Sequence, residues 1–239
     1  MPTRDFRGAP LDAIKLAAAV LMVADHVDTI LLDGGAPWLW RIGRAAYPLF
    51  ALVTALHLAR GADARAYAAG LLLWAVPTQL VYAWAFPYGS TEASILATLA
   101  AGTVLAGALG RAGSWRHLAF AAGLAACFLA PQFARTGVDF GLAGIFLPAA
   151  TLCALRRPWP DGLWLVACLL ALNASGWHPP GESRLAATLG AAGTGAAGLG
   201  LAVGLAPFLA RWGRFLPRWG LRVFYPAHLA ALAAWRALA

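Results

Sequence analysis

The feature that most constrains this chain is a series of apolar runs, each long enough for a membrane-spanning helix and separated by short polar gaps. A helix needs about 20 apolar residues to cross the hydrocarbon core of a bilayer. Such runs lie near residues 11–32, 43–59, 66–86, 92–109, 116–133, 139–155, 162–176, 185–208 and 220–238. Helix breakers occupy several gaps, as in Pro158-Trp159-Pro160. The sequence therefore predicts an all-α, polytopic transmembrane helix bundle of about nine spans.

The scarcity of charged residues supports this prediction. Only 12% of the 239 residues are charged, whereas a soluble domain has about 25%. A charge at the bilayer centre costs about 2.5–3.5 kcal/mol, so membrane spans contain few of them. The spans and their short connections fill the chain, so we expect residues 1–239 to form one membrane-embedded domain. The three cysteines lie in apolar runs without metal-site spacing, and no metal site is expected.

The positions of the arginines indicate how the spans are oriented. A net charge of +8 on a soluble protein would suggest a nucleic-acid partner. Here most arginines lie in short gaps between apolar runs, where they act as topology signals, and we expect no nucleic-acid partner. If the N-terminus is inside, most arginines fall in the inner segments. This bias predicts a cytoplasmic N-terminus.

The first span carries ionisable side chains that are costly inside a membrane and therefore point to function. Asp12, Lys15, Met22 and His26 fall on one stripe of the helix, with Asp25 about a quarter turn away. A polar stripe on an apolar helix must face a bundle interior or a wet cleft. His26, in the outer half, can act as a general base because an imidazole exchanges a proton near neutral pH. Alternatively, it is a structural histidine.

The second span places further polar residues near this stripe. Because the first loop is short, Arg44 enters the same outer half as His26. Arg44 can form an ion pair with Asp25, stabilise an oxyanion, or anchor the helix at the membrane interface. If Arg44 does not pair with Asp25, the Asp25 carboxylate can instead be the partner of His26. His57 lies near the inner end of the span, as an interface anchor or a ligand contact.

The last span contains a proline between two groups that can take part in chemistry. Pro226 kinks the helix and opens space beside Tyr225 and His228. The predicted topology places both groups toward the inner half, whereas His26 lies in the outer half.

Four motifs together resemble one protein family. They are Leu11-Asp12-Ala13-Ile14-Lys15 continuing to Met22-Val23-Ala24-Asp25-His26, then Ile42-Gly43-Arg44-Ala45-Ala46-Tyr47-Pro48-Leu49-Phe50, Phe140-Gly141-Leu142-Ala143-Gly144 and Phe224-Tyr225-Pro226-Ala227-His228-Leu229. These segments resemble motifs of the TraX-type proteins, the conjugative-pilin acetylases and their chromosomal relatives. The matches extend from the first predicted span to the last.

The resemblance implies an acetyltransferase of the bacterial inner membrane that takes acetyl-CoA from the cytoplasm and modifies the N-terminal amine of a pilin subunit. It implies that His26 is the catalytic histidine, with Asp25 as its motif partner and Arg44 in support. Phosphates bind fixed cations, so inner Lys and Arg residues are candidates for the nucleotide end of the donor. The residues expected to bind the donor are Lys15, Tyr47, His57, Arg156, Arg157, Arg218, Arg222, Tyr225 and His228.

Three other functions fit part of the pattern. Asp25, His26 and Arg44 would also suit the relay of a proton-coupled transporter. The chain shows no repeated halves of the kind that many transporters have, which disfavours transport. A non-catalytic partner in pilus assembly, or an O-acetyltransferase acting on a glycan or lipid, would fit the same motifs.

Overall fold

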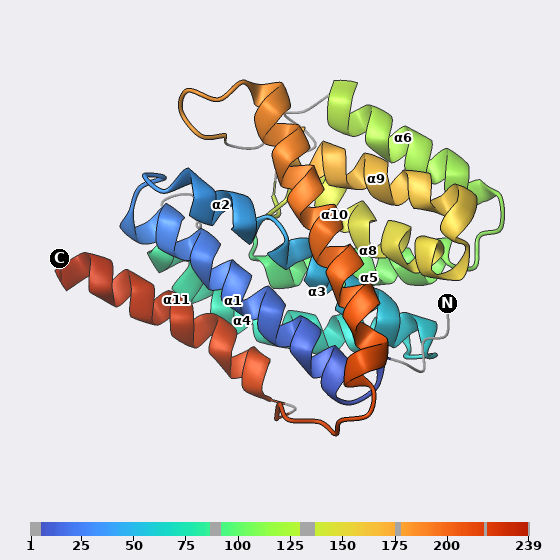
Figure 1. Ribbon diagram of the computed structural model, residues 1–239, viewed down its shortest axis with the longest axis horizontal. Helices are drawn as coiled ribbons and strands as arrows, with labels where there is room; N and C mark the ends of the chain where they lie inside the picture. The colour runs from blue at the N-terminus through green and yellow to red at the C-terminus, as the bar shows by residue number, and fades with distance from the viewer. Residues whose placement is uncertain (1–5, 87–91, 130–136, 175–177, 218, 239) are drawn as a thin grey trace.

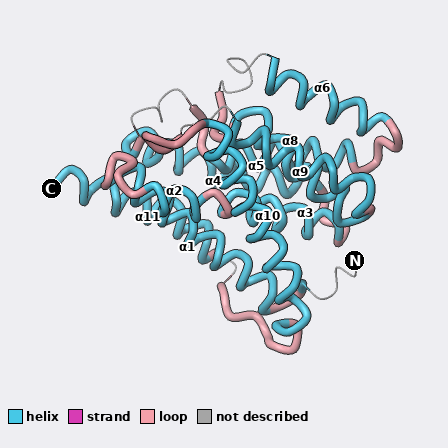
Figure 2. The backbone as a smooth tube through the Cα atoms, turned by 45° about the horizontal axis from the view of Figure 1, so that its top comes forward, coloured by secondary structure: helices cyan, strands magenta, loops and turns pink. Residues whose placement is uncertain are grey.

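The computed structural model describes residues 6–86, 92–129, 137–174, 178–217 and 219–238, which form helices joined by short loops (Figure 1, Figure 2). In chain order the helices are α1 (Ala9–Leu31), α2 (Pro37–Gly43), α3 (Ala46–Ala59), α4 (Ala64–Ala85), α5 (Ile95–Leu109), α6 (Trp115–Leu129), α8 (Gly141–Arg156), α9 (Pro158–Ala174), α10 (Arg184–Leu209) and α11 (Gly220–Leu238). In these ranges the only extended pairing is an isolated bridge between Ala93 and Val138. The predicted all-α bundle is confirmed.

Helices α3 and α8 form the centre of the bundle. Most side chains of α3 are buried, and so is the stretch of α8 from Leu147 to Cys153. Around this centre, α1 packs against α2, α3, α10 and α11, while α5 and α9 flank α8. Helices α1 and α11 lie side by side and run in the same direction (Figure 1). This parallel pair brings the first and last motifs of the chain together.

Three helical stretches are long and apolar enough to cross a membrane, by length and composition. They are Pro37–Ala59, which combines α2 and α3, Ala64–Ala85, which is α4, and Arg184–Leu209, which is α10. Three shorter apolar helices, α5, α6 and α8, accompany them. Large apolar side chains such as Val76 and Leu80 on α4 are exposed, as expected for a surface that faces lipid rather than water. The count of about nine spans stays a prediction.

Two boundaries differ from those expected. A short helix, α2, precedes the second predicted span because Pro37 opens a helix there, and proline is tolerated in a first turn. The predicted breaker at residues 158–160 falls inside α9, where Trp159 has extended dihedrals (φ −124°, ψ 130°) and kinks the helix. Residues 130–133 and 175–176, the predicted ends of two spans, lie outside the described residues.

Candidate functional site

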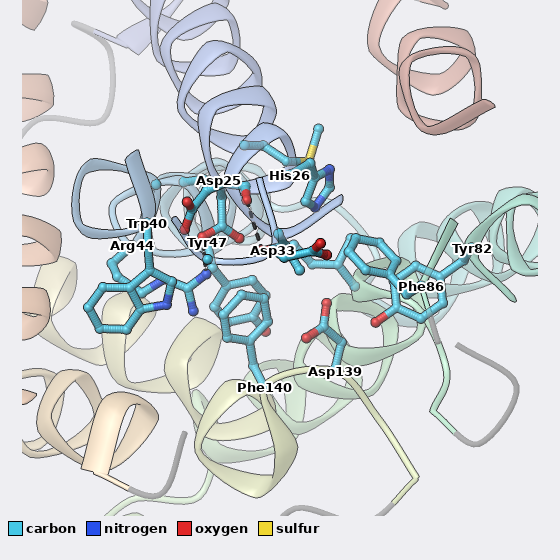
Figure 3. Close-up of a pocket in the computed structure, with 17 residues that line it drawn as sticks. Asp25, His26, Asp33, Trp40, Arg44, Tyr47, Tyr82, Phe86, Asp139 and Phe140 are labelled. Atoms are coloured by element: carbon cyan, nitrogen blue, oxygen red, sulfur yellow. Dashed lines mark hydrogen bonds and ion pairs between the residues drawn. The ribbon is translucent and has the colours of Figure 1, made fainter. Parts of the chain in front are cut away.

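Two cavities lie along α1 and share part of a wall. The first, of about 350 Å³, is the His26 cavity (Figure 3), and the second, of about 460 Å³, is the Lys15 cavity. Met22 and Ile95 line both. The charged and aromatic residues lining the His26 cavity are Asp25, His26, Asp28, Asp33, Trp40, Arg44, Tyr47, Tyr82, Phe86, Asp139 and Phe140. Those lining the Lys15 cavity are Lys15, Phe50, His57, Tyr67, Trp74, Arg214, Arg222, Phe224 and Tyr225.

The polar stripe of α1 faces the interior, which confirms that prediction. Lys15 lines one cavity, His26 lines the other, and Met22 lies between them on the shared wall. Asp12, at the start of the stripe, is fully buried and accepts hydrogen bonds from the backbone N–H groups of Phe215 and Leu216, each at 3.0 Å. The first turn of α1 therefore holds the segment that leads into α11.

His26 is hydrogen-bonded to His228, not to the adjacent Asp25. The distance from His26 Nδ1 to His228 Nε2 is 2.8 Å, and the ring planes are parallel within 1°. The other His228 nitrogen, Nδ1, lies 3.0 Å from the carbonyl oxygen of Phe224, to which it can only donate. In the neutral pair, His228 Nε2 must then accept the proton of His26 Nδ1, which leaves a lone pair on His26 Nε2. This bonding pattern sets His26 up as a base.

The position of His228 corrects one expectation. His228 was expected toward the inner half, away from His26, but the hydrogen bond places the two rings at the same depth. The reason is that the segment before α11 binds Asp12, in the first turn of α1, through its backbone, so α11 starts beside α1 and runs alongside it nearly in register. Tyr225 is buried beside both histidines, with its ring centroid 6.4 Å from that of His26.

Arg44 is the partner of Asp25, which resolves an alternative that the sequence left open. The two side chains form an ion pair at the His26 cavity, and both are largely buried. The guanidinium also lies 5.3 Å from the ring centroid of Trp40 and 5.5 Å from that of Phe140. Its Nε–H is buried and has no hydrogen-bond partner among the described residues. The ion pair fixes the guanidinium and leaves one donor unused.

The close approach of α2 to α1 depends on a glycine. A Cβ atom added to Gly43 would lie 2.5 Å from the Cβ of Asp25, well inside contact distance. Only glycine lets the end of α2 lie directly on α1, which carries Arg44 to Asp25. The two residues of the Gly-Arg pair in the second motif therefore act together: Gly43 allows the close approach of the helices, and Arg44 forms the ion pair.

Tyr47 fixes α3 against α8 at the floor of the same cavity. Its hydroxyl donates to the carbonyl of Gly144 at 2.7 Å, and its ring stacks on Phe140 with centroids 4.4 Å apart. Tyr47 is buried, so this hydrogen bond satisfies a group that water does not reach. The second and third motifs thus meet through one side chain.

Asp139 enters the His26 cavity from the segment before α8. Its backbone is held on both sides, because its N–H donates to Ala93 at 2.9 Å and its carbonyl accepts from the Thr98 hydroxyl at 2.6 Å. The next residue, Phe140, adopts a left-handed conformation with φ 62°. Figure 3 shows the Asp139 carboxylate pointing into the cavity from the side opposite α1.

The Lys15 cavity has a cationic part and an apolar, aromatic part. Lys15, Arg214 and Arg222 supply the cations. His57 also lines the cavity, with Nδ1 2.8 Å from the carbonyl oxygen of Val53. The aromatic lining, which includes Tyr225, continues toward the wall shared with the His26 cavity. Its lining can bind a ligand that has both an anionic group and an apolar part.

Of the expected donor-binding residues, Lys15, His57, Arg222 and Tyr225 line the Lys15 cavity and Tyr47 lines the His26 cavity. His228 contacts His26. Arg156 and Arg157 line neither cavity, and the Arg156 guanidinium donates to the carbonyl of Gly110 at 2.9 Å. Arg218 lies outside the described residues.

Sequence reasoning missed several lining residues. Arg214 was counted only among the arginines that act as topology signals, and Asp139 was not proposed as a site residue. Trp40 and Phe86 carried no signal, because a lone aromatic residue in an apolar chain is more often packing than site. All four line a cavity.

The apolar helices and the buried polar centre define a membrane protein of helical-bundle type, with a histidine pair near the junction of two cavities. Residues 10–236 match the family described as TraX protein, and the chain belongs to this family. It is 37% identical over 227 residues to Protein TraX of Escherichia coli strain K12, covering 92% of this chain and 85% of that protein. A second Protein TraX from Escherichia coli is 35% identical over 229 residues, with the same coverage. No solved structure matches the chain.

Proposed function

We propose that this chain is a multi-pass enzyme of the bacterial inner membrane, with a cytoplasmic N-terminus, that transfers the acetyl group of acetyl-CoA to the N-terminal amine of a pilin subunit. The observation that carries the proposal is the His26–His228 hydrogen bond at the His26 cavity. It leaves one lone pair on a buried imidazole close to a second cavity that suits the donor.

The Lys15 cavity is lined by charges that suit the donor. Its cations Lys15, Arg214 and Arg222 suit the phosphates of the nucleotide end. Its apolar part would hold the pantetheine arm, which then ends at Met22 and Ile95, the wall shared with the His26 cavity. Lys15 and His26 are eleven residues apart on one helix, or about 16 Å along its axis. This spacing suits a donor whose charged end and thioester are far apart.

The acceptor would occupy the His26 cavity. His26 Nε2 takes a proton from the amine as its nitrogen attacks the thioester carbonyl, and the carbon–sulfur bond then breaks. The proton on His26 passes to the departing thiolate, so the products are an amide and free CoA. The unused Nε–H of Arg44 is a donor for the oxyanion that forms during the attack. His228 holds the required tautomer of His26 throughout.

The test uses the purified protein with radiolabelled acetyl-CoA and a peptide that carries the pilin N-terminus. His26→Ala should lower the rate of peptide acetylation about 10²–10⁴-fold, because it removes the base. His178→Ala is the matched control, since His178 lines neither cavity. An acetylation rate that is the same in His26→Ala and wild type would exclude the proposal.

Substitution of His228 tests the tautomer. His228→Gln keeps an oxygen that can accept the His26 Nδ1 proton, whereas His228→Leu does not. We expect the leucine variant to lose most activity and the glutamine variant to keep a measurable part. Equal losses in the two variants would show that His228 acts by packing alone.

A further inference from the structure

The His26 cavity carries more acidic groups than it can neutralise. Among the residues that the structure describes, its lining contains four carboxylates but one arginine. Arg44 neutralises Asp25, and Asp28 accepts the backbone N–H of Ala36 at 2.7 Å. Asp33 is exposed at the rim. The field inside the cavity therefore favours a cationic ligand and disfavours an anionic one.

Asp139 is the inward carboxylate without a counter-ion. Among the described residues, no Lys, Arg or His nitrogen forms an ion pair with it. It faces the cavity from the side opposite His26 (Figure 3). A carboxylate in this position would be stabilised by a ligand that brings a positive charge.

The backbone around Asp139 is built to keep the carboxylate in place. Ala93 and Thr98 bind its backbone from the neighbouring α5 region, and Phe140 is held at a positive φ of 62°. A non-glycine residue in this conformation is strained, and such strain is typical of functional sites. Rigid support of this kind fixes a ligand-binding group before the ligand arrives.

We propose that Asp139 binds the protonated amine of the acceptor in the His26 cavity and thereby makes the site selective for amines over hydroxyls. This inference rests on the proposed acetyl transfer and assigns the residue that recognises the acceptor. The ammonium bound to Asp139 passes one proton to His26, which releases it to solvent, and this leaves the free amine. The amine nitrogen then attacks the thioester carbonyl while His26 takes its second proton, and that proton passes to the departing thiolate.

A hydroxyl acceptor lacks the charge that Asp139 would recognise. It would enter a cavity whose field offers it no ion pair, and it would leave the Asp139 carboxylate uncompensated. An O-acetyltransferase would have no use for this carboxylate. The choice between an amine and a hydroxyl acceptor therefore depends on one residue.

The test compares full-length wild type with Asp139→Asn and Asp139→Glu, using two peptides that differ only in an N-terminal amine or hydroxyl. Asp139→Asn should raise the KM for the amine peptide at least tenfold while the KM for acetyl-CoA changes less than threefold. The rate with the hydroxyl peptide should be unchanged, and Asp139→Glu should restore part of the amine selectivity. A third peptide, with a blocked N-terminus and a free lysine, distinguishes a terminal amine from a side-chain amine as the acceptor.

Asp63→Asn is the matched control, because Asp63 lines neither cavity and asparagine can also accept the Ala66 N–H that caps α4. Equal losses with the amine and hydroxyl peptides, or an unchanged KM for the amine peptide in Asp139→Asn, would overturn the inference. Equilibrium binding of the amine peptide without acetyl-CoA separates this inference from the proposed function. One outcome would be that wild type binds the peptide, Asp139→Asn does not, and neither protein transfers an acetyl group. This outcome would support Asp139 as the acceptor-binding residue and would contradict the proposed acetyl transfer.

Discussion

The contact between Gly43 and Asp25 makes a sharp prediction about the substitution Gly43→Ala. The added Cβ would lie 2.5 Å from the Asp25 Cβ and 3.0 Å from its Oδ1. Carbon atoms pack at about 3.5–4.0 Å, so α2 and α1 must separate by about 1 Å. Overpacking of this kind costs about 1–3 kcal/mol of stability.

The effect on activity should be larger than the effect on stability. Arg44 directly follows Gly43, so the separation moves the guanidinium and the Asp25 carboxylate relative to His26. A displacement of about 1 Å in a reacting geometry lowers a rate about 10²-fold. We therefore expect acetylation of the peptide to fall about 100-fold while the protein still folds.

Two measurements test this prediction together: the acetylation rate and the thermal unfolding midpoint in detergent. A loss of 1 kcal/mol lowers the midpoint of a chain of this size by about 2–4 °C. The matched control is Gly193→Ala on α10, where an added Cβ meets nothing within 4 Å. The control should gain about 0.5–1 kcal/mol, because alanine favours helix. Wild-type activity in Gly43→Ala would refute the reasoning.

Two further predictions concern residues at or near the Lys15 cavity. Asp12→Asn keeps the size of the side chain but removes its charge. The Asp12 carboxylate binds two backbone N–H groups and lies 3.7 Å from the Arg214 Nε. We therefore expect the free energy of unfolding to fall by about 1–3 kcal/mol, measured by thermal unfolding. A midpoint equal to that of wild type would show that the segment before α11 needs no anchor. Arg222→Gln should raise the KM for acetyl-CoA about tenfold, because it removes one charge-assisted contact to phosphate, and leave the KM for the peptide unchanged. An unchanged KM for acetyl-CoA in steady-state assays would remove Arg222 from the donor site.

Local sequence patterns were sufficient to predict the helices and the face of α1 that points toward the two cavities. The positions of Asp12, Lys15 and His26 on one stripe follow from the helical repeat alone, and the structure places that stripe at the two cavities. The Asp25–Arg44 pair was within reach of sequence reasoning because a short loop joins the two motifs. Features that depend on residues close together in the sequence could therefore be predicted.

Contacts between segments far apart in the sequence could not be predicted in the same way. His228 was expected at a different depth from His26 because sequence does not show that the backbone of the segment before α11 binds Asp12. Asp139 depends on Thr98, 41 residues away in the sequence, to hold its backbone. Arg156 and Arg157 were chosen by charge alone, and charge does not reveal that Arg156 caps the end of α5 through the Gly110 carbonyl. Which cations meet a cavity is decided by packing.

The parallel pairing of α1 and α11 links stability to chemistry. Near one end Asp12 binds the segment before α11, and near the other His26 binds His228. The first contact joins α1 to the segment that leads into α11, and the second joins α1 to α11 itself, so a loss of the Asp12 anchor allows α11 to slide or tilt along α1. A hydrogen bond between imidazoles weakens steeply as its distance grows or its angle bends. A small movement of α11 along α1 would therefore weaken the bond that keeps the proton on His26 Nδ1. Asp12→Asn should therefore lower activity more than its effect on folding explains, although Asp12 lies more than half the length of α1 away from His26.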